Sequence, residues 1–241
     1  MDLIKLDVNN NQKIYDVSFM TNLKFLAINF LCGVNQNGIR NLDLIELNAF
    51  ANPKICNLSF MTNLKFLNIG RTCGINQNGI QNLDLITLHA YDNPKIYDLS
   101  FMTNLKLLDI SANCGINQEG IRNLNLIRLD ATNNPKIYDV SFMSKLKILN
   151  IASSCGINQN GIRNLDLISL RNLDLISLCA YNNPKIYNVS FMTNLKILDI
   201  ANNCGIDQNG IQKLNLISLN AHNNPQIYDL SFMTTLKNLV I

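Results

Sequence analysis

The chain has 241 residues, of which 47% are hydrophobic and 15% are charged. This composition can bury a sizeable core, which excludes a disordered tail and a disulfide-stapled miniprotein. The formal net charge is +3, from 20 basic and 17 acidic side chains without a long run of one sign, so composition carries no polyanion-binding signature. No apolar stretch of about 18 residues occurs, which excludes a membrane-spanning helix, and the first residues do not match a secretory signal.

A 41-residue tract starts at Leu42 and recurs at Leu83, Leu124, Leu165 and Leu214. Each tract contains two half-units with the pattern L-x-x-L-x-(L/I/A/V)-x-x-N, so the true unit has 20 to 21 residues. The half-unit with the N-P-K-I segment or its variants is called odd, and the half-unit with C-G-I-N or its variants is called even. Units of this length cannot hide an apolar face alone, so the coils must stack.

The pattern resembles the leucine-rich repeat family, and the resemblance covers essentially the whole chain. The odd segment N-P-K-I-Y-D-L-S-F-M at 93–102 further resembles the internalin and phosphatase-regulator class, and the even segment C-G-I-N-Q-N-G-I resembles the cysteine-containing subtype. The resemblance implies an α/β-type, mostly β, curved solenoid with a parallel concave sheet of about twelve strands and short 3₁₀ or extended convex segments. It also implies one leucine-rich repeat domain over residues 1–241.

Side chains that recur in every copy are expected to point inward and stack on the next coil. Besides the strand Leu, Ile and Ala positions, we predict two such columns and an amide ladder. The isoleucine column is Ile14, Ile55, Ile96, Ile137, Ile186 and Ile227, and the phenylalanine column is Phe19, Phe60, Phe101, Phe142, Phe191 and Phe232. The ladder that closes the odd strands, by bonding backbone groups at the bend, is Asn11, Asn52, Asn93, Asn134, Asn183 and Asn224.

Five of the seven cysteines form one column after the even strands: Cys32, Cys73, Cys114, Cys155 and Cys204. Neighbours in this column are two coils apart, roughly 9 to 10 Å, whereas a disulfide needs Cα atoms within about 7 Å. We therefore predict buried free thiols, with no disulfide or metal cluster along the column. Paired glycines such as Gly115 and Gly120 are expected to serve turn geometry.

One local insertion interrupts the repeat, because RNLDLISL occurs twice in tandem at 163–170 and 171–178. Only one copy can supply a strand, and we predict that it is the second, since it leads directly into the next odd turn. The first copy would then bulge on the convex side or coil into a helical turn, although a register that uses the first copy as strand is the alternative. No evident capping segment flanks the repeats, so we expect either a longer protein or self-association through uncapped ends.

The candidate site is the concave face of the sheet, because the third, fifth and seventh positions of L-x-x-L-x-L-x-x-N should point to solvent and vary most between copies. Variation on one face fits a surface that reads a partner, and it also fits drift on an unused surface. Aromatic residues at the seventh position are typical interface anchors, although their rings could instead lie flat on the strand backbone. The predicted partner-binding residues are Phe50, Tyr91, His89, Arg128, Asp130, Tyr181 and His222. A neighbouring apolar row at the third position of the even strands, Phe25, Phe66, Leu107, Ile148 and Ile197, could face solvent or pack inward.

Catalysis is not predicted. The two histidines, His89 and His222, are about six strands or roughly 29 Å apart, and no Ser/His/Asp set, phosphate loop or metal-ligand spacing remains once the repeat is subtracted. We expect no cofactor and no metal. Lysine columns, such as the one through Lys24 and Lys65, leave polyanion binding as an alternative, but aspartate columns run beside them, so nucleic acid is not an expected partner.

The sequence therefore favours a non-catalytic protein-protein interaction scaffold that binds a protein of unknown identity through its concave face. The seven cysteines and the missing signal favour a cytoplasmic location. A secreted or surface-exposed internalin-like adhesin is the alternative, since the repeat resembles internalins and two N-x-S sequons occur, at Asn57 and Asn188.

Overall fold

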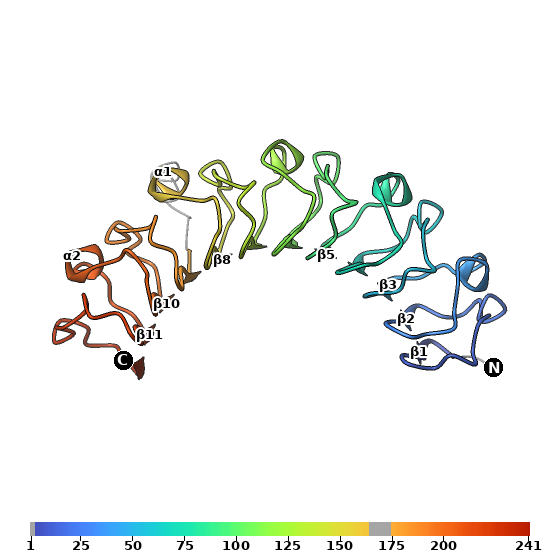
Figure 1. Ribbon diagram of the computed structural model, residues 1–241, viewed down its shortest axis with the longest axis horizontal. Helices are drawn as coiled ribbons and strands as arrows, with labels where there is room; N and C mark the ends of the chain where they lie inside the picture. The colour runs from blue at the N-terminus through green and yellow to red at the C-terminus, as the bar shows by residue number, and fades with distance from the viewer. Residues whose placement is uncertain (1–2, 164–174) are drawn as a thin grey trace. The chain divides into compact units, whose positions relative to one another are not determined.

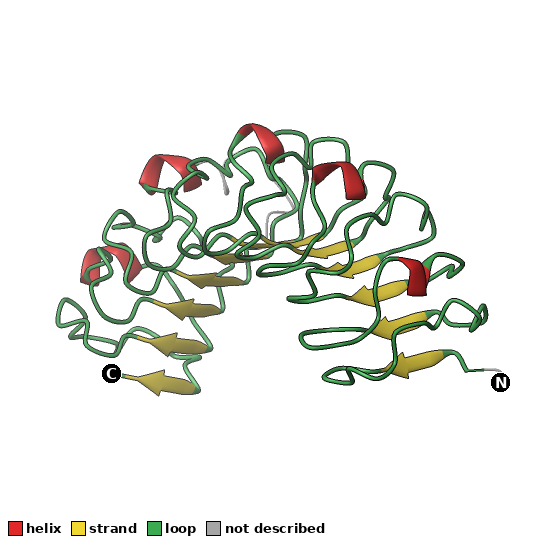
Figure 2. Cartoon of the chain, turned by 45° about the vertical axis from the view of Figure 1, so that its right-hand side comes forward, coloured by secondary structure: helices red, strands yellow, loops and turns green. Residues whose placement is uncertain are grey.

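The computed structural model of the protein describes residues 3–163 and 175–241. The chain forms two compact units, Met1–Leu124 and Asn125–Ile241. Each unit is a stack of coils, and each coil contributes one strand of three residues (Figures 1 and 2). That residues 1–241 act as one domain stays a prediction.

The first unit contains six parallel strands that pair in chain order, residue opposite residue. Short 3₁₀ helices lie on the far side of three even coils from the strands (Figure 1). The elements are β1 (Lys5–Asp7), β2 (Phe25–Ala27), η1 (Asn37–Ile39), β3 (Glu46–Asn48), β4 (Phe66–Asn68), η2 (Gln77–Ile80), β5 (Thr87–His89), β6 (Leu107–Asp109) and η3 (Glu119–Ile121).

The second unit repeats this plan with six more parallel strands and two single-turn α-helices in place of the 3₁₀ helices. Its elements are β7 (Arg128–Asp130), β8 (Ile148–Asn150), α1 (Gln159–Ile162), β9 (Ser177–Cys179), β10 (Ile197–Asp199), α2 (Gln208–Ile211), β11 (Ser218–Asn220) and β12 (Asn238–Val240). The described residues thus confirm the prediction of about twelve short parallel strands joined by short 3₁₀ or extended segments, except that α1 and α2 are single-turn α-helices, which the prediction did not include.

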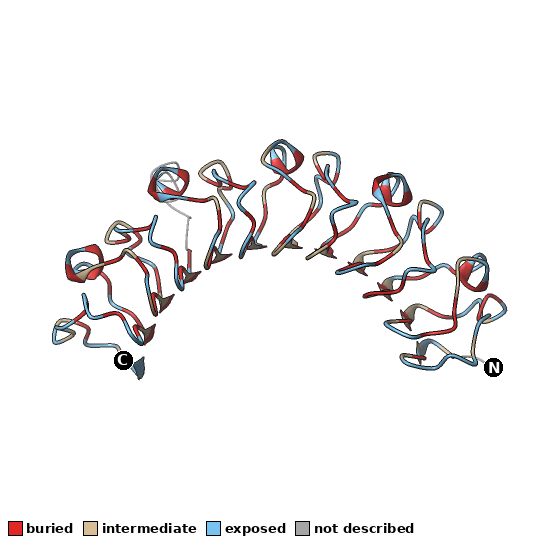
Figure 3. Ribbon diagram, in the orientation of Figure 1, coloured by how far each residue is buried: buried red, intermediate tan, exposed pale blue. Residues whose placement is uncertain are grey.

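Leucine spacing explains where each strand lies. In the coil of β3, Leu44, Leu47 and Ala49 have no solvent exposure, whereas the flanking Glu46 and Asn48 are half-buried on the other side of the strand. The same alternation recurs from coil to coil, so each unit has a continuous apolar interior and one solvent-facing side of its sheet (Figure 3). We call this solvent-facing side the sheet face.

The asparagine ladder is present as predicted. The Asn183 amide donates to the carbonyl oxygens of Ile151 at 2.7 Å and Ile157 at 3.5 Å, and its Oδ1 accepts from the amide of Lys185 at 3.1 Å. Asn52, Asn93, Asn134 and Asn224 are buried in the same way. Asn11, in the first coil, is exposed and accepts from two backbone amides, so its ladder role is partial.

The isoleucine column is buried from Ile55 to Ile227, and Ile14 is half-buried. The predicted phenylalanine column is wrong. Phe19 is 71% exposed and Phe60 is 42% exposed, whereas the next residue in the odd coil, such as Met61 at 1%, fills the interior. The Met61 amide donates to the Leu58 carbonyl at 2.8 Å, which closes a tight turn. Only the first and fourth residues of this turn point inward, so the phenylalanine at its third position faces out.

The cysteine column is buried, as predicted, and all seven cysteines are free thiols; Cys56 is exposed on an outer segment and Cys179 is half-buried in β9. Burial raises the pKa of the Cys155 and Cys204 thiols to about 11. The expectation for the glycines is wrong, since no described glycine has a positive φ. A Cβ on Gly115 would overlap the carbonyl oxygens of Pro94 and Ile96 in the preceding coil, so glycine is needed for close coil packing.

Strand β9 begins at Ser177, and its first two residues belong to the second RNLDLISL copy. The strand therefore forms where the prediction placed it. The predicted bulge over 163–170 lies outside the described residues, apart from Arg163.

Candidate functional site: the sheet faces

An aromatic cluster lies on the sheet face of the first unit. The rings of Phe50 and Tyr91 stack, with centroids 5.6 Å apart and planes inclined by 29°. The Arg71 guanidinium lies over the Phe50 ring, 5.6 Å from its centroid, in a cation–π arrangement. All three residues follow strands of this unit, β3, β4 and β5, at adjacent places on one edge of the sheet. We call Phe50, Arg71 and Tyr91 the aromatic cluster.

The Tyr91 ring lies against the backbone of Gly70, the residue between the two aromatic positions. A Cβ on Gly70 would be only 2.6 Å from Cε1 of Tyr91. The ring is half-buried as a result, and this burial raises the pKa of its phenol although Arg71 acts in the opposite direction. The flat-ring arrangement that the sequence left open is therefore the one observed for Tyr91, and its outer side stays exposed.

A second group on the same face involves His89 of β5. Its ring is 5.5 Å from that of Phe66, and its Nδ1 is 3.7 Å from Oδ2 of Asp109 in β6. Burial raises the pKa of Asp109, but the nearby His89 ring and hydrogen bonds from the Ser111 hydroxyl and amide outweigh burial, and the pKa is lowered overall. His89 is thus held by an ionised carboxylate beside an aromatic ring.

In the second unit, Arg128 and Asp130 lie in β7. Arg128 is exposed. Asp130 is half-buried and accepts hydrogen bonds from the Asn150 side chain at 2.9 Å and from the Thr132 amide at 3.0 Å. The carboxylate of Asp130 is therefore oriented by β8 and by its own turn, which leaves Arg128 as the more accessible charge.

The two remaining predicted residues of the second unit are exposed and belong to separate coils. Tyr181, after β9, is 38% exposed, and its hydroxyl accepts a hydrogen bond from the Asn202 side chain at 2.7 Å. His222, after β11, has its Nδ1 3.3 Å from the carbonyl oxygen of Ile241. Among the described residues, no ring stack joins these two side chains to another ring, in contrast to Phe50 and Tyr91.

The apolar row at the third position of the even strands lies on the sheet faces. Ile148 and Ile197 are 38% and 46% exposed, and Phe25, Phe66 and Leu107 are half-buried. The row is therefore accessible in both units and most open in the second.

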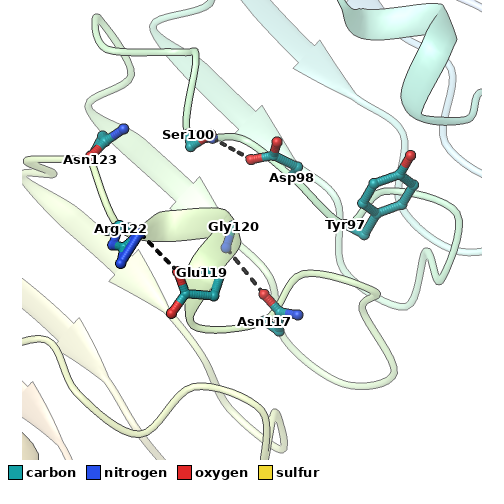
Figure 4. A pocket seen from close by; sticks show the side chains of 8 residues that line it. All are labelled: Tyr97, Asp98, Ser100, Asn117, Glu119, Gly120, Arg122 and Asn123. Atoms are coloured by element: carbon teal, nitrogen blue, oxygen red, sulfur yellow. Dashed lines mark hydrogen bonds and ion pairs between the residues drawn. The ribbon is translucent and has the colours of Figure 1, made fainter.

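A hollow of about 400 Å³ on the outer side of the first unit lies between Tyr97 and η3 (Figure 4). Its polar groups bond one another: Asp98 accepts from the Ser100 amide at 2.8 Å, and Glu119 pairs with Arg122 at 3.2 Å. Because these groups bond each other, the hollow carries no convergent set of groups for a ligand.

The lysine columns are used within the repeat. Lys24 pairs with Asp43 at 3.0 Å and Lys65 with Asp84 at 2.9 Å, each with an aspartate of the next coil. In the other column, the Lys185 ammonium donates to the Cys155 carbonyl oxygen at 3.1 Å. In the described part of the chain, no group of three or more His, Cys, Asp or Glu side chains could hold a metal ion, and no helix is long and apolar enough to cross a membrane.

Solved structures share this coil architecture. An internalin, InlF from Listeria monocytogenes, is 22% identical over 99% of this chain and 73% of its own, with a TM-score of 0.68. The functional domain of InlJ from the same organism, described as including a cysteine ladder, is 20% identical over 98% of this chain and 57% of its own, with a TM-score of 0.57. The chain has the leucine-rich repeat fold.

This chain is also similar in fold to a chain of the yeast Rad7 and Elc1 complex. The two are 16% identical over 99% of this chain and 81% of the other, with a TM-score of 0.53. No protein-family model matches the sequence, and no curated protein matches it. The likeness is therefore one of fold.

Sequence reasoning missed Arg71. Arg71 follows the seventh position, where the predicted set of exposed strand residues ends. A signal was available, since the other even coils carry Phe30, Ala112, Ser153 and Asn202 at this place, so Arg71 is the one charged residue among them.

Proposed function

We propose that this leucine-rich repeat chain is a non-catalytic scaffold that binds a protein partner through its sheet faces. The observation that carries the proposal is the contrast between the two sides of each strand. Inward positions repeat the same buried side chains, whereas the outward positions are half-exposed and differ from coil to coil. A surface with local, accessible and partly aromatic side chains fits recognition of one partner.

The similar structures agree with this role at the level of the fold. One of them belongs to a complex, that of Rad7 and Elc1, and a parallel sheet built from stacked coils offers a broad, rigid binding surface. In the first unit, the aromatic cluster and the His89–Asp109 pair supply both ring surface and charge on one face.

Affinity capture from lysate of the source cells tests the proposal. The test variant replaces Phe50, Tyr91, Tyr181 and His222 with Ala, and the matched control replaces four exposed outer residues, Tyr97, Tyr138, Tyr187 and Tyr228, with Ala. We expect the sheet-face variant to lose partners that the wild type and the outer-face control both retain, with circular dichroism unchanged in all three. Partners lost only by the outer-face control would overturn the proposal.

A cytoplasmic location is part of the proposal, because all seven cysteines are free thiols. The adhesin alternative is favoured by the fold likeness to internalins. A membrane-impermeant maleimide applied to intact source cells separates the two, since Cys56 is exposed. Cytoplasmic protein stays unlabelled until the cells are lysed, whereas a surface adhesin is labelled at once.

Polyanion binding is the remaining alternative, and the aspartate pairs of Lys24 and Lys65 weigh against it. A steep loss of affinity for nucleic acid with rising salt would support it. Self-association is tested by sedimentation equilibrium over a range of concentrations.

A further inference from the structure

A second hollow in the first unit, of about 480 Å³, lies at the edge of the sheet where β2, β3 and β4 end. We call it the edge hollow. Its walls are largely apolar, and its size is that of a small ligand or side-chain pocket. The lining residues are Gln12, Phe30, Leu31, Cys32, Ala51, Asn52, Pro53, Lys54 and Thr72.

Two of these residues depart from the repeat. Phe30 and Leu31 stand where the other even coils carry Arg71-Thr72, Ala112-Asn113, Ser153-Ser154 and Asn202-Asn203. Both are more than half exposed, 54% for Phe30 and 51% for Leu31, so the interior does not need them. Two adjacent apolar side chains facing solvent at one coil alone indicate a local task.

The backbone of this coil departs as well. Leu31 has a φ of 58°, whereas in the next even coil the left-handed residue is Arg71, one place earlier. The Cys32 amide donates to the Asn29 carbonyl at 3.0 Å and closes this turn. A left-handed residue follows each strand from β1 to β11, so the conformation belongs to the repeat and only its place in the coil of Leu31 is shifted. The shifted turn brings Phe30 and Leu31 together at the rim of the edge hollow.

The charge at the edge hollow has one sign. Lys54 is the sole charged residue of the lining. Its ammonium donates to the Cys32 carbonyl oxygen at 3.0 Å, which fixes its position and leaves two of its three N–H donors for a ligand. Arg71, which precedes the lining residue Thr72, places its guanidinium over the Phe50 ring. An apolar hollow with a positioned cation complements an apolar side chain that is followed or preceded by a carboxylate.

We propose that the edge hollow binds an apolar side chain of an acidic peptide segment, with a carboxylate of that segment on Lys54. The inference rests on the proposed scaffold function and names the class of partner. Contact with the aromatic cluster through Arg71 would continue the interface from the hollow onto the sheet face.

Two variants copied from sister coils test the edge hollow without foreign residues. Phe30→Ser with Leu31→Ser reproduces Ser153-Ser154 and removes the apolar rim. Lys54→Gln reproduces Gln226, which makes the equivalent hydrogen bond to the Cys204 carbonyl oxygen at 3.5 Å, and removes only the charge. Since both replacements already occur in folded coils, we expect unchanged circular dichroism.

The probe is a phage-displayed library of random dodecapeptides, selected on the immobilised 241-residue chain. We expect enriched peptides to combine Leu, Ile, Phe or Met with adjacent Asp or Glu. For a synthetic enriched peptide measured by fluorescence anisotropy, we expect Kd to rise at least tenfold in the double Ser variant and about tenfold in Lys54→Gln, with a weaker salt dependence in the latter.

Failure to select any peptide, enrichment without acidic and apolar residues, or an unchanged Kd in the double Ser variant would overturn the assignment of the edge hollow. Such a result is distinguishable from failure of the scaffold proposal, which depends on the capture experiment with the sheet-face variant. If captured partners are lost by the sheet-face variant but no peptide requires Phe30 and Leu31, the scaffold proposal stands and the edge hollow has no part in it.

Discussion

Tyr91 and Tyr181 occupy the same position of the repeat, one in each unit, and behave differently. The coil before Tyr91 presents Gly70, so the ring lies on the strand backbone and stacks with Phe50. In the coil before Tyr181, the residue at the position of Gly70 is Ala152. There the tyrosine hydroxyl instead accepts a hydrogen bond from the Asn202 side chain at 2.7 Å. The half-buried stacked ring thus needs both Gly70 beneath it and Phe50 beside it, and neither feature is present at Tyr181.

On this fold, the residues in the neighbouring coils determine how a side chain lies on the sheet face. Phe50 lies two coils before Tyr91, and the residue at the equivalent repeat position two coils before Tyr181 is Thr132. The Thr132 hydroxyl is buried and has no hydrogen-bond partner among the described residues. The sheet face of the first unit therefore presents a ring cluster, whereas the described side chains on that of the second form hydrogen-bonded pairs without a ring stack.

The largest expected effect is a loss of stability on substituting glycines in the interior. It tests whether the interiors of the two units are packed alike although their sheet faces differ. Gly74→Ala and Gly205→Ala are equivalent substitutions in the first and second unit, and each Cβ would overlap two backbone carbonyl oxygens of the preceding coil. We expect each to lower the free energy of unfolding by about 1–3 kcal/mol, because backbone cannot move aside easily. Thermal unfolding followed by circular dichroism measures the loss. If only one of the two variants keeps the melting temperature of the wild type, the coils of the unit that carries it are more loosely packed.

The next effect tests whether Gly70 allows Tyr91 to stack on Phe50. In Gly70→Ala the new Cβ meets the Tyr91 ring, which can swing outward, so we expect loss of the Phe50 stack and about 0.5–1.5 kcal/mol of stability. Ring-current shifts of labelled Phe50, measured by NMR, report the stack directly. Ala152→Gly is the reciprocal change in the second unit, and it should not create a stack, since Thr132 has no ring. Persistence of the Phe50 shifts in Gly70→Ala would contradict the explanation.

A smaller effect concerns the turns that follow the strands. The left-handed positions of the second unit are Asn133, Ser153, Asn182, Asn202 and Asn223, whereas those of the first include Leu31, Ala51 and Ala112. Because Asn tolerates positive φ better than Ala, we expect Ala51→Asn to stabilise the chain by about 0.5–1 kcal/mol and Asn182→Ala to destabilise it by a similar amount. Urea denaturation of the two variants would show shifts of opposite sign, and shifts in the same direction would refute this account.

The smallest effect is a pH dependence from Asp109. Its folded pKa is lowered from 3.8, so its contribution to stability is present above that value and is lost as the pH falls through the folded pKa below it. We expect Asp109→Asn to flatten the decrease in melting temperature below about pH 4. Ser111→Ala, which removes the hydroxyl bonded to Asp109 at 2.7 Å, should flatten it partly, and an identical acid profile in all three proteins would rule out this role.

Much of the candidate site was accessible to sequence reasoning, because outward strand positions follow from strict alternation. Phe50, Tyr91 and His89 lie on the sheet face for this reason, as do Arg128 and Asp130. Their contacts were not accessible, since a stack such as that of Phe50 on Tyr91 joins residues 41 positions apart and depends on Gly70 between them. Whether these residues bind a partner stays a prediction.

The repeat period by itself determined the parallel coils, the asparagine ladder and the buried thiol column, because every copy meets the same environment in the copy beside it. Only the tertiary structure decided which of two adjacent apolar residues enters the interior. In the Leu58–Met61 turn the chain reverses within four residues, so alternation no longer applies and Met61 is buried while Phe60 is exposed. The same holds for Leu31, where the left-handed residue of the turn lies one place later than in the other even coils. The repeat period does not predict this shift.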